Sequence, residues 1–389
     1  MQTIVLAKGK EQALLRGHLW IFSGAVARIS GEVQEGDTVA VQTSRGEHLG
    51  YGFYGSASIA VRIVTRGNEM PGPDLWAERL RTAWQWRQRL GLPSESAGNA
   101  FRLFHGEGDG IPGLVIDVYG NSAVVQPHHA GIYRLADEIG NALLTLENEG
   151  LKLDTIYLKA SGTLSGDVED RWLHGDAREA LVRENDFTFQ VNWAEGQKTG
   201  FFLDQRENRS LLARYAAGKE VLNTFSYTGG FSLAALKAGA TSVCSVDVSA
   251  KALAIADKNA EINGVADAHG SVCQDTLKYL QENDKLWDII VLDPPAYAKS
   301  MHKRHNAVMG YKRLNAAGMA RVKPGGLLFT FSCSQVVDRD LFRNTVAAAG
   351  MELGRNMRIL HELSQSPDHP VNLFHPEGAY LKGLVLALD

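Results

Sequence analysis

Cysteine is scarce in this sequence, because only Cys244, Cys273 and Cys333 occur among 389 residues and no two of them form a C-x-x-C pair. An odd number at wide spacing excludes a disulfide framework and offers no zinc-ligand pattern. The histidines also lack metal-ligand spacing, so we expect no metal site. Few cysteines are typical of a reducing compartment, and we expect a cytoplasmic location.

Long hydrophobic runs and an excess of basic charge are missing as well. No apolar segment approaches the roughly 18 residues of a membrane span, and the N-terminal MQTIVLAKGKEQALL lacks the apolar stretch of a signal peptide. Lys and Arg number 40 against 44 Asp and Glu, which gives a net charge of −4. Any surface that binds nucleic acid must therefore be a local patch.

The sequence patterns predict three domains, at residues 1–68, 75–190 and 191–389. Residues 1–66 alternate apolar and polar residues with glycine at the bends, which indicates short β-strands. RGNEMPGPD (66–74) is typical of a linker, and residues 75–90 have the spacing of a helix. Residues 101–190 mix strands with a helix near 132–146, which predicts an α+β unit.

From about residue 196, continuous apolar strands alternate with amphipathic helices. Strands are predicted at EVLNTFS (220–226), SVCSVDVS (242–249), WDIIVLD (287–293) and GGLLFTFSC (325–333). Helices are predicted at 231–240, 249–264 and 313–323, and two more strands, which would form a hairpin, close the chain. This alternation predicts the α/β fold class, with a doubly wound parallel sheet.

Residues suited to a ligand follow several of the predicted strands, at the edge where open parallel sheets bind ligands. Each has a purely structural alternative, such as a turn, a helix N-cap, a strand stop or a buried thiol. Their joint occurrence favours one cleft for a nucleoside cofactor. These residues are Gly229 and Gly230, Asp247, Asp275, Asp293, and Cys333 within Ser-Cys-Ser.

The turn LDPPAY (292–297) favours a planar substrate beside that cofactor. Pro294 and Pro295 make the backbone rigid, so that the Asp293 carboxylate can bond the edge of a ring. Tyr297 can stack on the face of a base. Cys244 and Cys273 are predicted to be core thiols.

A basic and aromatic segment near the N-terminus favours RNA binding. Its members are Lys8, Lys10, Arg16, His18, Trp20 and Phe22. The alternative is a small barrel with core aromatics and a charged rim. Arg79, Arg81, Arg87 and Arg89 either extend this patch or form a solvated helix face.

Several motifs together resemble one family, the bacterial 23S ribosomal RNA cytosine-C5 methyltransferases that depend on S-adenosylmethionine. They are GQKTGFFLDQRENR (196–209), NTFSYTGGFSLAALKAGA (223–240), VDVS (246–249), LDPPAY (292–297), FSCS (331–334) and DHPVNLFHPEGAYLKG (368–383). Residues 6–29 resemble the family's N-terminal PUA domain, and residues 106–120 resemble its central domain. Residues 155–185 depart from the family's Arg- and acid-rich pattern.

The resemblance implies a class I methyltransferase fold and a set of site residues. It implies that Cys333 is the nucleophile and that Asp293 faces the cytosine. Pro295 and Tyr297 are predicted to bind the substrate base, and Lys8, Lys10, Arg16 and Trp20 are predicted to contact the RNA. It implies cofactor contacts from Lys198, Thr199, Gly200, Phe202, Phe225, Ser226, Tyr227, Thr228, Gly229, Gly230, Asp247, Asp275, Asp293 and Pro294. Lys382 is a further candidate contact for RNA or cofactor.

The expected activity is methyl transfer to carbon 5 of a cytosine in large-subunit ribosomal RNA, through a cysteine adduct at carbon 6. Related RNA enzymes often carry a second cysteine where this chain has Ala296, and the acceptor of the carbon-5 proton is unassigned. Two alternatives stay open: methylation of a guanine or adenine nitrogen, and a non-catalytic RNA-binding factor. A homodimer is a further candidate assembly, through a free sheet edge.

Overall fold

The computed structural model describes residues 1–298 and 300–389. The chain divides into two compact units. Unit 1 comprises residues 1–182, 191–203 and 367–378, and unit 2 comprises residues 183–190, 204–366 and 379–389. The expected division into three domains is finer than this one and stays a prediction.

Unit 1 begins with a six-stranded sheet of order β2-β6-β5-β4-β1-β3. Its apolar side chains alternate with polar ones, as the sequence predicts, and a core cluster that includes Ile4, Val39 and Val61 forms where the strands curve together. The elements are β1 (Thr3–Leu6), α1 (Gln12–Leu15), β2 (Trp20–Phe22), β3 (Val26–Ser30), β4 (Thr38–Gln42), β5 (His48–Tyr54) and β6 (Ile59–Arg66).

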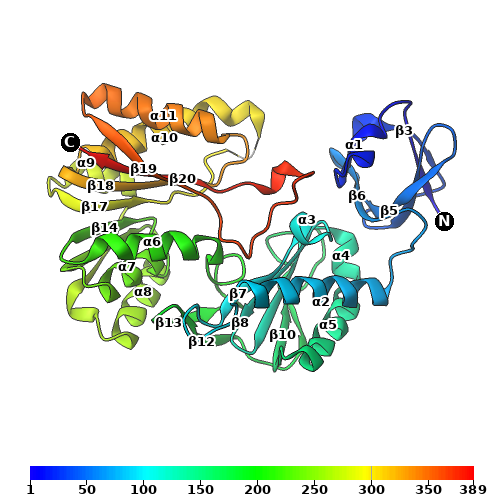
Figure 1. Ribbon diagram of the computed structural model, residues 1–389, viewed down its shortest axis with the longest axis horizontal. Coiled ribbons are helices and arrows are strands. Elements are labelled where there is room, and N and C mark those ends of the chain that lie inside the picture. The colour runs from blue at the N-terminus through cyan, green and yellow to red at the C-terminus, as the bar shows by residue number, and fades with distance from the viewer. Residues whose placement is uncertain (299) are drawn as a thin grey trace. The chain divides into compact units, whose positions relative to one another are not determined.

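A second, five-stranded sheet of order β11-β10-β9-β8-β7 follows in unit 1, covered by α2 and α5 (Figure 1). The elements are α2 (Pro73–Arg89), β7 (Ala100–His105), α3 (Gly106–Asp109), β8 (Leu114–Tyr119), β9 (Ser122–Pro127), α4 (Ala130–Arg134), α5 (Ala136–Leu144), β10 (Thr155–Leu158) and β11 (Arg171–His174). Strands β12 (Glu179–Glu184) and β13 (Phe187–Asn192) form a separate hairpin.

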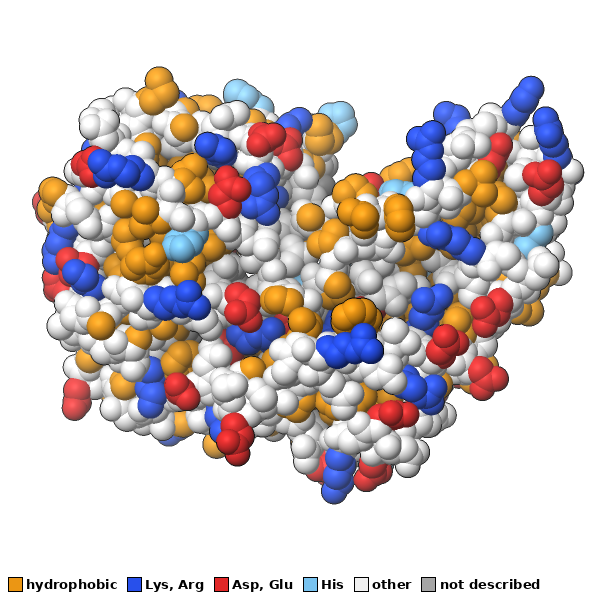
Figure 2. Space-filling model, in the orientation of Figure 1, with side chains coloured by type: hydrophobic (Ala, Val, Ile, Leu, Met, Phe, Trp, Pro, Cys, Tyr) orange, Lys and Arg blue, Asp and Glu red, His pale blue; other side chains and the backbone are white. Residues whose placement is uncertain are grey.

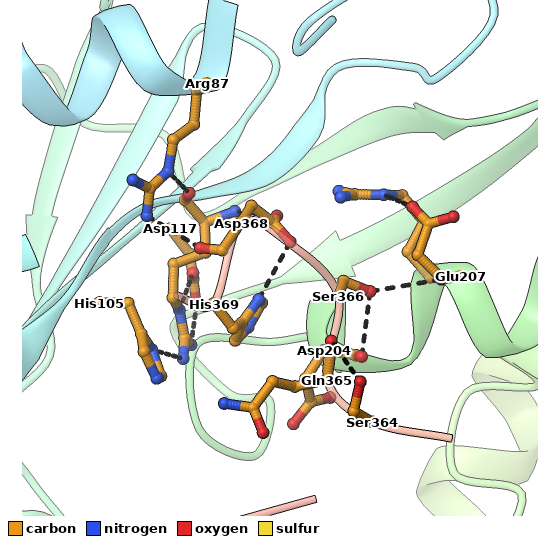
Figure 3. Close-up of polar contacts among 12 residues, drawn as sticks. Arg87, His105, Asp117, Asp204, Glu207, Ser364, Gln365, Ser366, Asp368 and His369 are labelled. Atoms are coloured by element: carbon orange, nitrogen blue, oxygen red, sulfur yellow. Dashed lines mark hydrogen bonds and ion pairs between the residues drawn. The ribbon is translucent and has the colours of Figure 1, made fainter. Parts of the chain in front are cut away.

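Arg87 on α2 neither extends a basic patch nor lies on a solvated face, because its side chain is only 1% exposed, whereas Arg81 and Arg89 of the same helix are exposed. It donates two hydrogen bonds of 2.7 Å to Asp109. It also donates one of 2.8 Å to the Asp368 carbonyl oxygen, and both of these residues are seen in Figure 3. Asp368 in turn accepts a bond from the Arg102 backbone N–H and contacts His369 at 3.1 Å. The segment 367–378 is thereby anchored inside unit 1.

Unit 2 is the predicted doubly wound fold, with a seven-stranded sheet of order β16-β15-β14-β17-β18-β20-β19. Helices α10 and α11 cover one face, and α6 and α7 cover the other (Figure 1). The strands are β14 (Glu220–Thr224), β15 (Ser242–Asp247), β16 (His269–Cys273), β17 (Trp287–Leu292), β18 (Val322–Ser332), β19 (Met357–Leu363) and β20 (Lys382–Leu388). The helices are α6 (Arg206–Ala216), α7 (Gly230–Lys237), α8 (Ala250–Ile262), α9 (Thr276–Glu282), α10 (Arg304–Met319) and α11 (Arg339–Leu353).

The central strands of unit 2, β14, β17 and β18, are buried on both faces, which explains why their sequences are mostly apolar. On β18, Leu328 packs into one core cluster while Phe329 and Phe331 pack into the other. Strands β14 to β18 pair in parallel, whereas β20 is antiparallel to both β18 and β19. The last two strands thus pair as expected. Within residues 1–298 and 300–389, no helix has the length and apolar character to cross a membrane.

Candidate active site

In unit 2, β15 and β16 extend the sheet on one side of β14, and β17 and β18 extend it on the other side. The strand order therefore reverses between β14 and β17. Ligands bind beyond the carboxyl ends of the strands at such a point. Leu292 of β17 lies opposite Thr224 of β14 and Thr330 of β18. Asp293, which follows β17, and Cys333, which follows β18, therefore leave the same edge of the sheet.

The turn after β14 has an unusual backbone. Phe225 and Tyr227 have φ angles of 54° and 47°, a left-handed region that such side chains rarely adopt. Gly229 has φ 82°, and a Cβ there would lie 3.0 Å from the Cβ of Ala256. Such strain, when the surrounding fold maintains it, points to a ligand-binding turn. Among the described residues, the buried Ser226 hydroxyl oxygen has no hydrogen-bond partner.

Asp247 ends β15 and is held by that turn. One carboxylate oxygen accepts the Tyr227 N–H at 2.9 Å, and the other accepts the Ser249 N–H at 2.8 Å. A carboxylate has about four lone-pair sites, so the group keeps acceptor capacity for hydroxyl groups of a ligand. Asp275 is exposed and caps α9 by accepting the Lys278 N–H at 2.9 Å, which is the structural alternative that the sequence left open.

Asp293 is half-buried, and one of its oxygens accepts a 3.0 Å hydrogen bond from the Gln205 side-chain amide. Gln205 fixes the direction of this carboxylate. Sequence reasoning missed it, although it lies within the quoted motif GQKTGFFLDQRENR. Tyr297 packs its ring on Tyr311, with centroids 4.6 Å apart. The pKa of Tyr297 is raised, mainly by burial, so its phenol is neutral at physiological pH.

Tyr311 on α10 lies near enough to both candidate catalytic residues for their charge to affect its acidity. Its side chain is buried, and burial is the main reason why its pKa rises to about 12. Negative charge on Cys333 and on Asp293 raises the pKa further, whereas the Ser332 hydroxyl lowers it. These influences place Tyr311 among the groups that surround the ends of β17 and β18. Tyr311 could not be singled out from the sequence, because it has the spacing of an ordinary buried helix residue.

The three cysteines differ in their surroundings. Cys333 is half-buried at the end of β18. Cys244 is half-buried too, its sulfur lies 3.7 Å from the Tyr279 hydroxyl, and burial raises its pKa. The prediction that Cys273 is a core thiol is wrong, because this residue is exposed. It ends β16, the edge strand of the sheet, where one side has no neighbouring strand.

The segment 198–202 belongs to unit 1, and its polar groups are used there. Thr199 is buried and donates to Asp117 at 2.6 Å, and its hydroxyl lies 3.0 Å from that of Tyr119. The Lys198 ammonium lies 4.3 Å from the centre of the Phe202 ring. Gly200 has φ 114° and no room for a Cβ beside Val191. The cofactor role of this segment stays a prediction.

Basic side chains of the first sheet face solvent. Lys8, Lys10 and Arg16 are exposed, and Figure 2 shows several Lys and Arg side chains on the part of the surface that belongs to the N-terminal strands. Trp20 is half-buried, donates its indole N–H to Glu107 at 2.8 Å and packs on His375 with centroids 4.4 Å apart. These contacts give Trp20 a structural role, and its contact with RNA stays a prediction.

One group of potential metal ligands, which the spacing of the histidines did not predict, occurs among residues 1–298 and 300–389. The ligand atoms of His18, His375 and Glu377 lie within 4.8 Å of one another. The His18 Nε2 already shares a 3.1 Å hydrogen bond with Glu377, and the His375 Nδ1 lies 3.7 Å from the other Glu377 oxygen. The His18–Glu377 hydrogen bond gives the cluster a structural role within unit 1.

Two family models match the chain. Residues 4–66 match the PUA-like domain, and residues 157–375 match the S-adenosylmethionine-dependent methyltransferases. The second match covers more than half of the chain and includes the turn after β14, Asp247, Asp293 and Cys333. The chain belongs to the family of S-adenosylmethionine-dependent methyltransferases.

Similar proteins with curated names narrow the comparison. A protein of Aeromonas hydrophila named "Ribosomal RNA large subunit methyltransferase I" is 40% identical over 407 residues, covering 99% of this chain and 98% of its own length. A protein of the same name from Escherichia coli is 37% identical, with 98% of both chains covered. A solved structure assigned as a SAM-dependent methyltransferase from Streptococcus mutans covers 100% of both chains with a TM-score of 0.86 at 23% identity, which shows the fold.

The residues around the turn after β14 fit S-adenosylmethionine. The buried Ser226 oxygen is an acceptor that a ligand donor can use, Gly229 leaves space at the start of α7, and Asp247 offers oxygens for ribose hydroxyls. The assignment of individual contacts to parts of the cofactor stays a prediction, which replacement of Asp247 tests.

Asp247→Asn is expected to weaken the binding of S-adenosylmethionine roughly 10- to 100-fold, because hydrogen bonds to a charged group contribute about 1.5–3 kcal/mol. The amide would also place an NH₂ group against one of the two backbone N–H donors. Isothermal titration calorimetry measures the change. Asp267→Asn, which alters an exposed aspartate between α8 and β16, is the matched control and should bind as the wild type does. Unchanged affinity in Asp247→Asn would exclude a ribose contact.

Proposed function

We propose that this protein transfers a methyl group from S-adenosylmethionine to carbon 5 of a cytosine in large-subunit ribosomal RNA, in the cytoplasm. The RNA substrate is supported by the names of relatives that align over nearly the whole chain. The PUA-like match at residues 4–66 and the exposed Lys8, Lys10 and Arg16 support contacts with the phosphate backbone. A homodimer stays a prediction.

One observation carries the choice of carbon 5. A half-buried cysteine, Cys333, stands at the end of β18, and Asp293 stands at the end of the adjacent parallel strand β17. A methyl acceptor at an amino or ring nitrogen already has a lone pair and needs no thiol. Carbon 5 of cytosine is a poor nucleophile until a thiolate adds to carbon 6. The position of Cys333 beside Asp293 therefore favours cytosine over a guanine or adenine nitrogen.

In the proposed reaction, the Cys333 thiolate forms a bond to carbon 6, and the electron pair of the 5,6 double bond makes carbon 5 nucleophilic. Asp293, oriented by Gln205, acts as the acid at the N3 edge of the ring. Its protonated carboxyl group donates the proton to N3 as the ring gains negative charge, and it takes this proton back when the thiolate leaves. When bound, S-adenosylmethionine supplies an electrophilic methyl group. A base then removes the carbon-5 proton, and the bond between carbon 6 and sulfur breaks, which restores both the double bond and the thiolate.

The target base must leave its stack to reach this edge of the sheet. Tyr297 is held against Tyr311, and Gly310 lacks the Cβ that would lie 2.9 Å from the Tyr297 ring. The ring is therefore fixed in place rather than free to turn. We infer that it forms a wall of the base pocket, which agrees with the flanking role expected from LDPPAY.

A trapping experiment tests the reaction. Wild type and Cys333→Ser are incubated with S-adenosylmethionine and ribosomal RNA that carries 5-fluorocytosine, from which fluorine cannot leave as a proton does. We expect an adduct that survives denaturation in the wild type and is absent in Cys333→Ser. Wild type with unsubstituted RNA is the control for nonspecific crosslinking. Methylation of ordinary RNA without any trapped adduct would move the target to a nitrogen atom.

A further inference from the structure

Lys382 has an unusual position for a lysine. It opens β20, lies opposite Ser332 of β18, and is only 5% exposed. Lysine is almost never fully buried unless a partner stabilises its charge, because an ammonium group loses favourable hydration on burial. A buried lysine at the edge of the sheet that carries the candidate active site is thus expected to have a partner there.

The contacts of Lys382 lead to the cysteine segment. Its ammonium donates a 2.6 Å hydrogen bond to the Ser334 carbonyl oxygen, and the Ser334 hydroxyl donates a 2.6 Å bond to the Ala298 carbonyl oxygen. Ser334, the residue after Cys333, is in this way bound to β20 and to the turn that follows Asp293, and Ser332, the residue before Cys333, lies opposite Lys382 in the sheet. An ammonium has three N–H donors, and Ser334 uses one of them.

The charged groups around Lys382 and Cys333 come from four parts of unit 2. Burial lowers the pKa of Lys382 to about 8, and negative charge on Cys333 opposes this change. At the start of α11, Arg339 lowers the pKa of Lys382 slightly further, and Asp338 raises it slightly. Tyr311 on α10 stays neutral. Asp293, which follows β17, is the acidic group at the end of the strand that neighbours β18.

We propose that the Lys382 ammonium positions Cys333 and holds it in its thiolate form, which makes the cysteine nucleophilic at neutral pH. The thiol loses its proton to water, and Lys382 keeps its own proton and compensates the new negative charge. A cation beside a cysteine is a recognised cause of thiolate stabilisation. The identity of the atom that the thiolate attacks rests on the proposed function, but the protonation state of the thiol does not. Lys382 is a positioning residue in this scheme. Its burial disfavours the direct contact with RNA for which the sequence made it a candidate.

The pH profile of cysteine alkylation tests this pairing without RNA or cofactor. Iodoacetamide reacts with the wild-type protein and with Lys382→Gln and Lys382→Arg over a range of pH, and mass spectrometry follows the Cys333 peptide. Gln keeps an N–H donor for Ser334 but removes the charge, whereas Arg keeps the charge. We expect the midpoint for Cys333 to rise by about one pH unit or more in Lys382→Gln and to stay low in Lys382→Arg. Lys258→Met, at an exposed lysine of α8, should leave it unchanged.

The other two cysteines are internal controls. The half-buried Cys244 should stay slow to react in every folded variant, so its rapid alkylation identifies a variant that has unfolded, and the exposed Cys273 is the reference for an accessible thiol. Equal midpoints in Lys382→Gln and wild type would overturn the proposal. In the wild-type protein alone, an alkylation midpoint of Cys333 at or above the pH of the Cys273 midpoint would also overturn the proposal. A trapping failure with a low Cys333 midpoint would reject the cytosine reaction and leave the lysine–cysteine pair intact.

Discussion

Cys333→Ala is expected to lower the rate of methyl transfer in a single turnover roughly 10⁴-fold, with the affinity for S-adenosylmethionine unchanged. Removal of a covalent nucleophile commonly has an effect of this size, because the remaining site can only hold the reactants. The cofactor contacts predicted for the turn after β14 and for Asp247 do not include the sulfur atom. The measurement is rapid-quench kinetics with excess enzyme and radiolabelled cofactor, beside calorimetry of cofactor binding.

Cys244→Ala and Cys273→Ala are the matched controls, because they remove the same group elsewhere in the sheet of unit 2. Cys273 is exposed at the edge strand, and its replacement should leave the rate as it is. Cys244 packs near Tyr279, so its replacement should lower stability slightly and leave the single-turnover rate within about twofold. A Cys333→Ala enzyme with wild-type rate would contradict covalent catalysis and favour a nitrogen target.

The sheet of unit 2 was predictable because its central strands are buried on both faces. EVLNT, WDIIVL and LLFTFS contain adjacent rather than alternating apolar residues, and the helices between them have amphipathic spacing. The carboxyl ends of parallel strands meet at one edge of a sheet. The sequence alone therefore predicted that Asp247, Asp293 and Cys333 lie at the same edge. The PUA-like start and the methyltransferase family were predicted from motifs and are supported by the family matches.

Element boundaries were less predictable where the pattern is weak. Helix α10 begins at Arg304 rather than near 313, because its first turns are polar and only half-covered. The sequence RENRSLLARYA, which forms α6, was not recognised as a helix because three of its polar residues, Arg206, Asn208 and Arg209, are buried. Helix α11 was also missed, although Asp338 caps it by accepting the Leu341 N–H, a signal that the sequence contains.

The residues missed in the site depend on contacts between distant parts of the chain. Gln205 reaches Asp293 across 88 positions, and Lys382 reaches Ser334 across 48 because β20 inserts between β18 and β19. No local pattern specifies such an insertion. Cys273 was misread for a related reason, since its strand is the edge of the sheet and an edge strand looks like a central one in sequence.

Asp109→Ala is expected to lower the free energy of unfolding of unit 1 by about 3–5 kcal/mol, because it leaves the Arg87 guanidinium buried without its carboxylate. Arg87 is 1% exposed and Asp109 is 7% exposed, and two hydrogen bonds of 2.7 Å join them. Asp109 also accepts the His105 N–H at 2.7 Å, a bond that the replacement removes. Urea titration followed by hydrogen exchange of peptides from β7 and β8 isolates unit 1 from unit 2.

The surface pair Arg171–Asp137 is the matched control, because it has the same two-bond geometry at 2.8 and 2.9 Å with 41% and 70% of the side chains exposed. Asp137→Ala should change stability by less than about 1 kcal/mol, since water solvates either partner alone. The double variant Arg87→Met, Asp109→Ala should lose less than the two single losses added together, because no unpaired charge is left in the interior. Strictly additive losses would mean that the two groups act through separate contacts, and that the Asp368 carbonyl rather than Asp109 is the partner that keeps Arg87 in place.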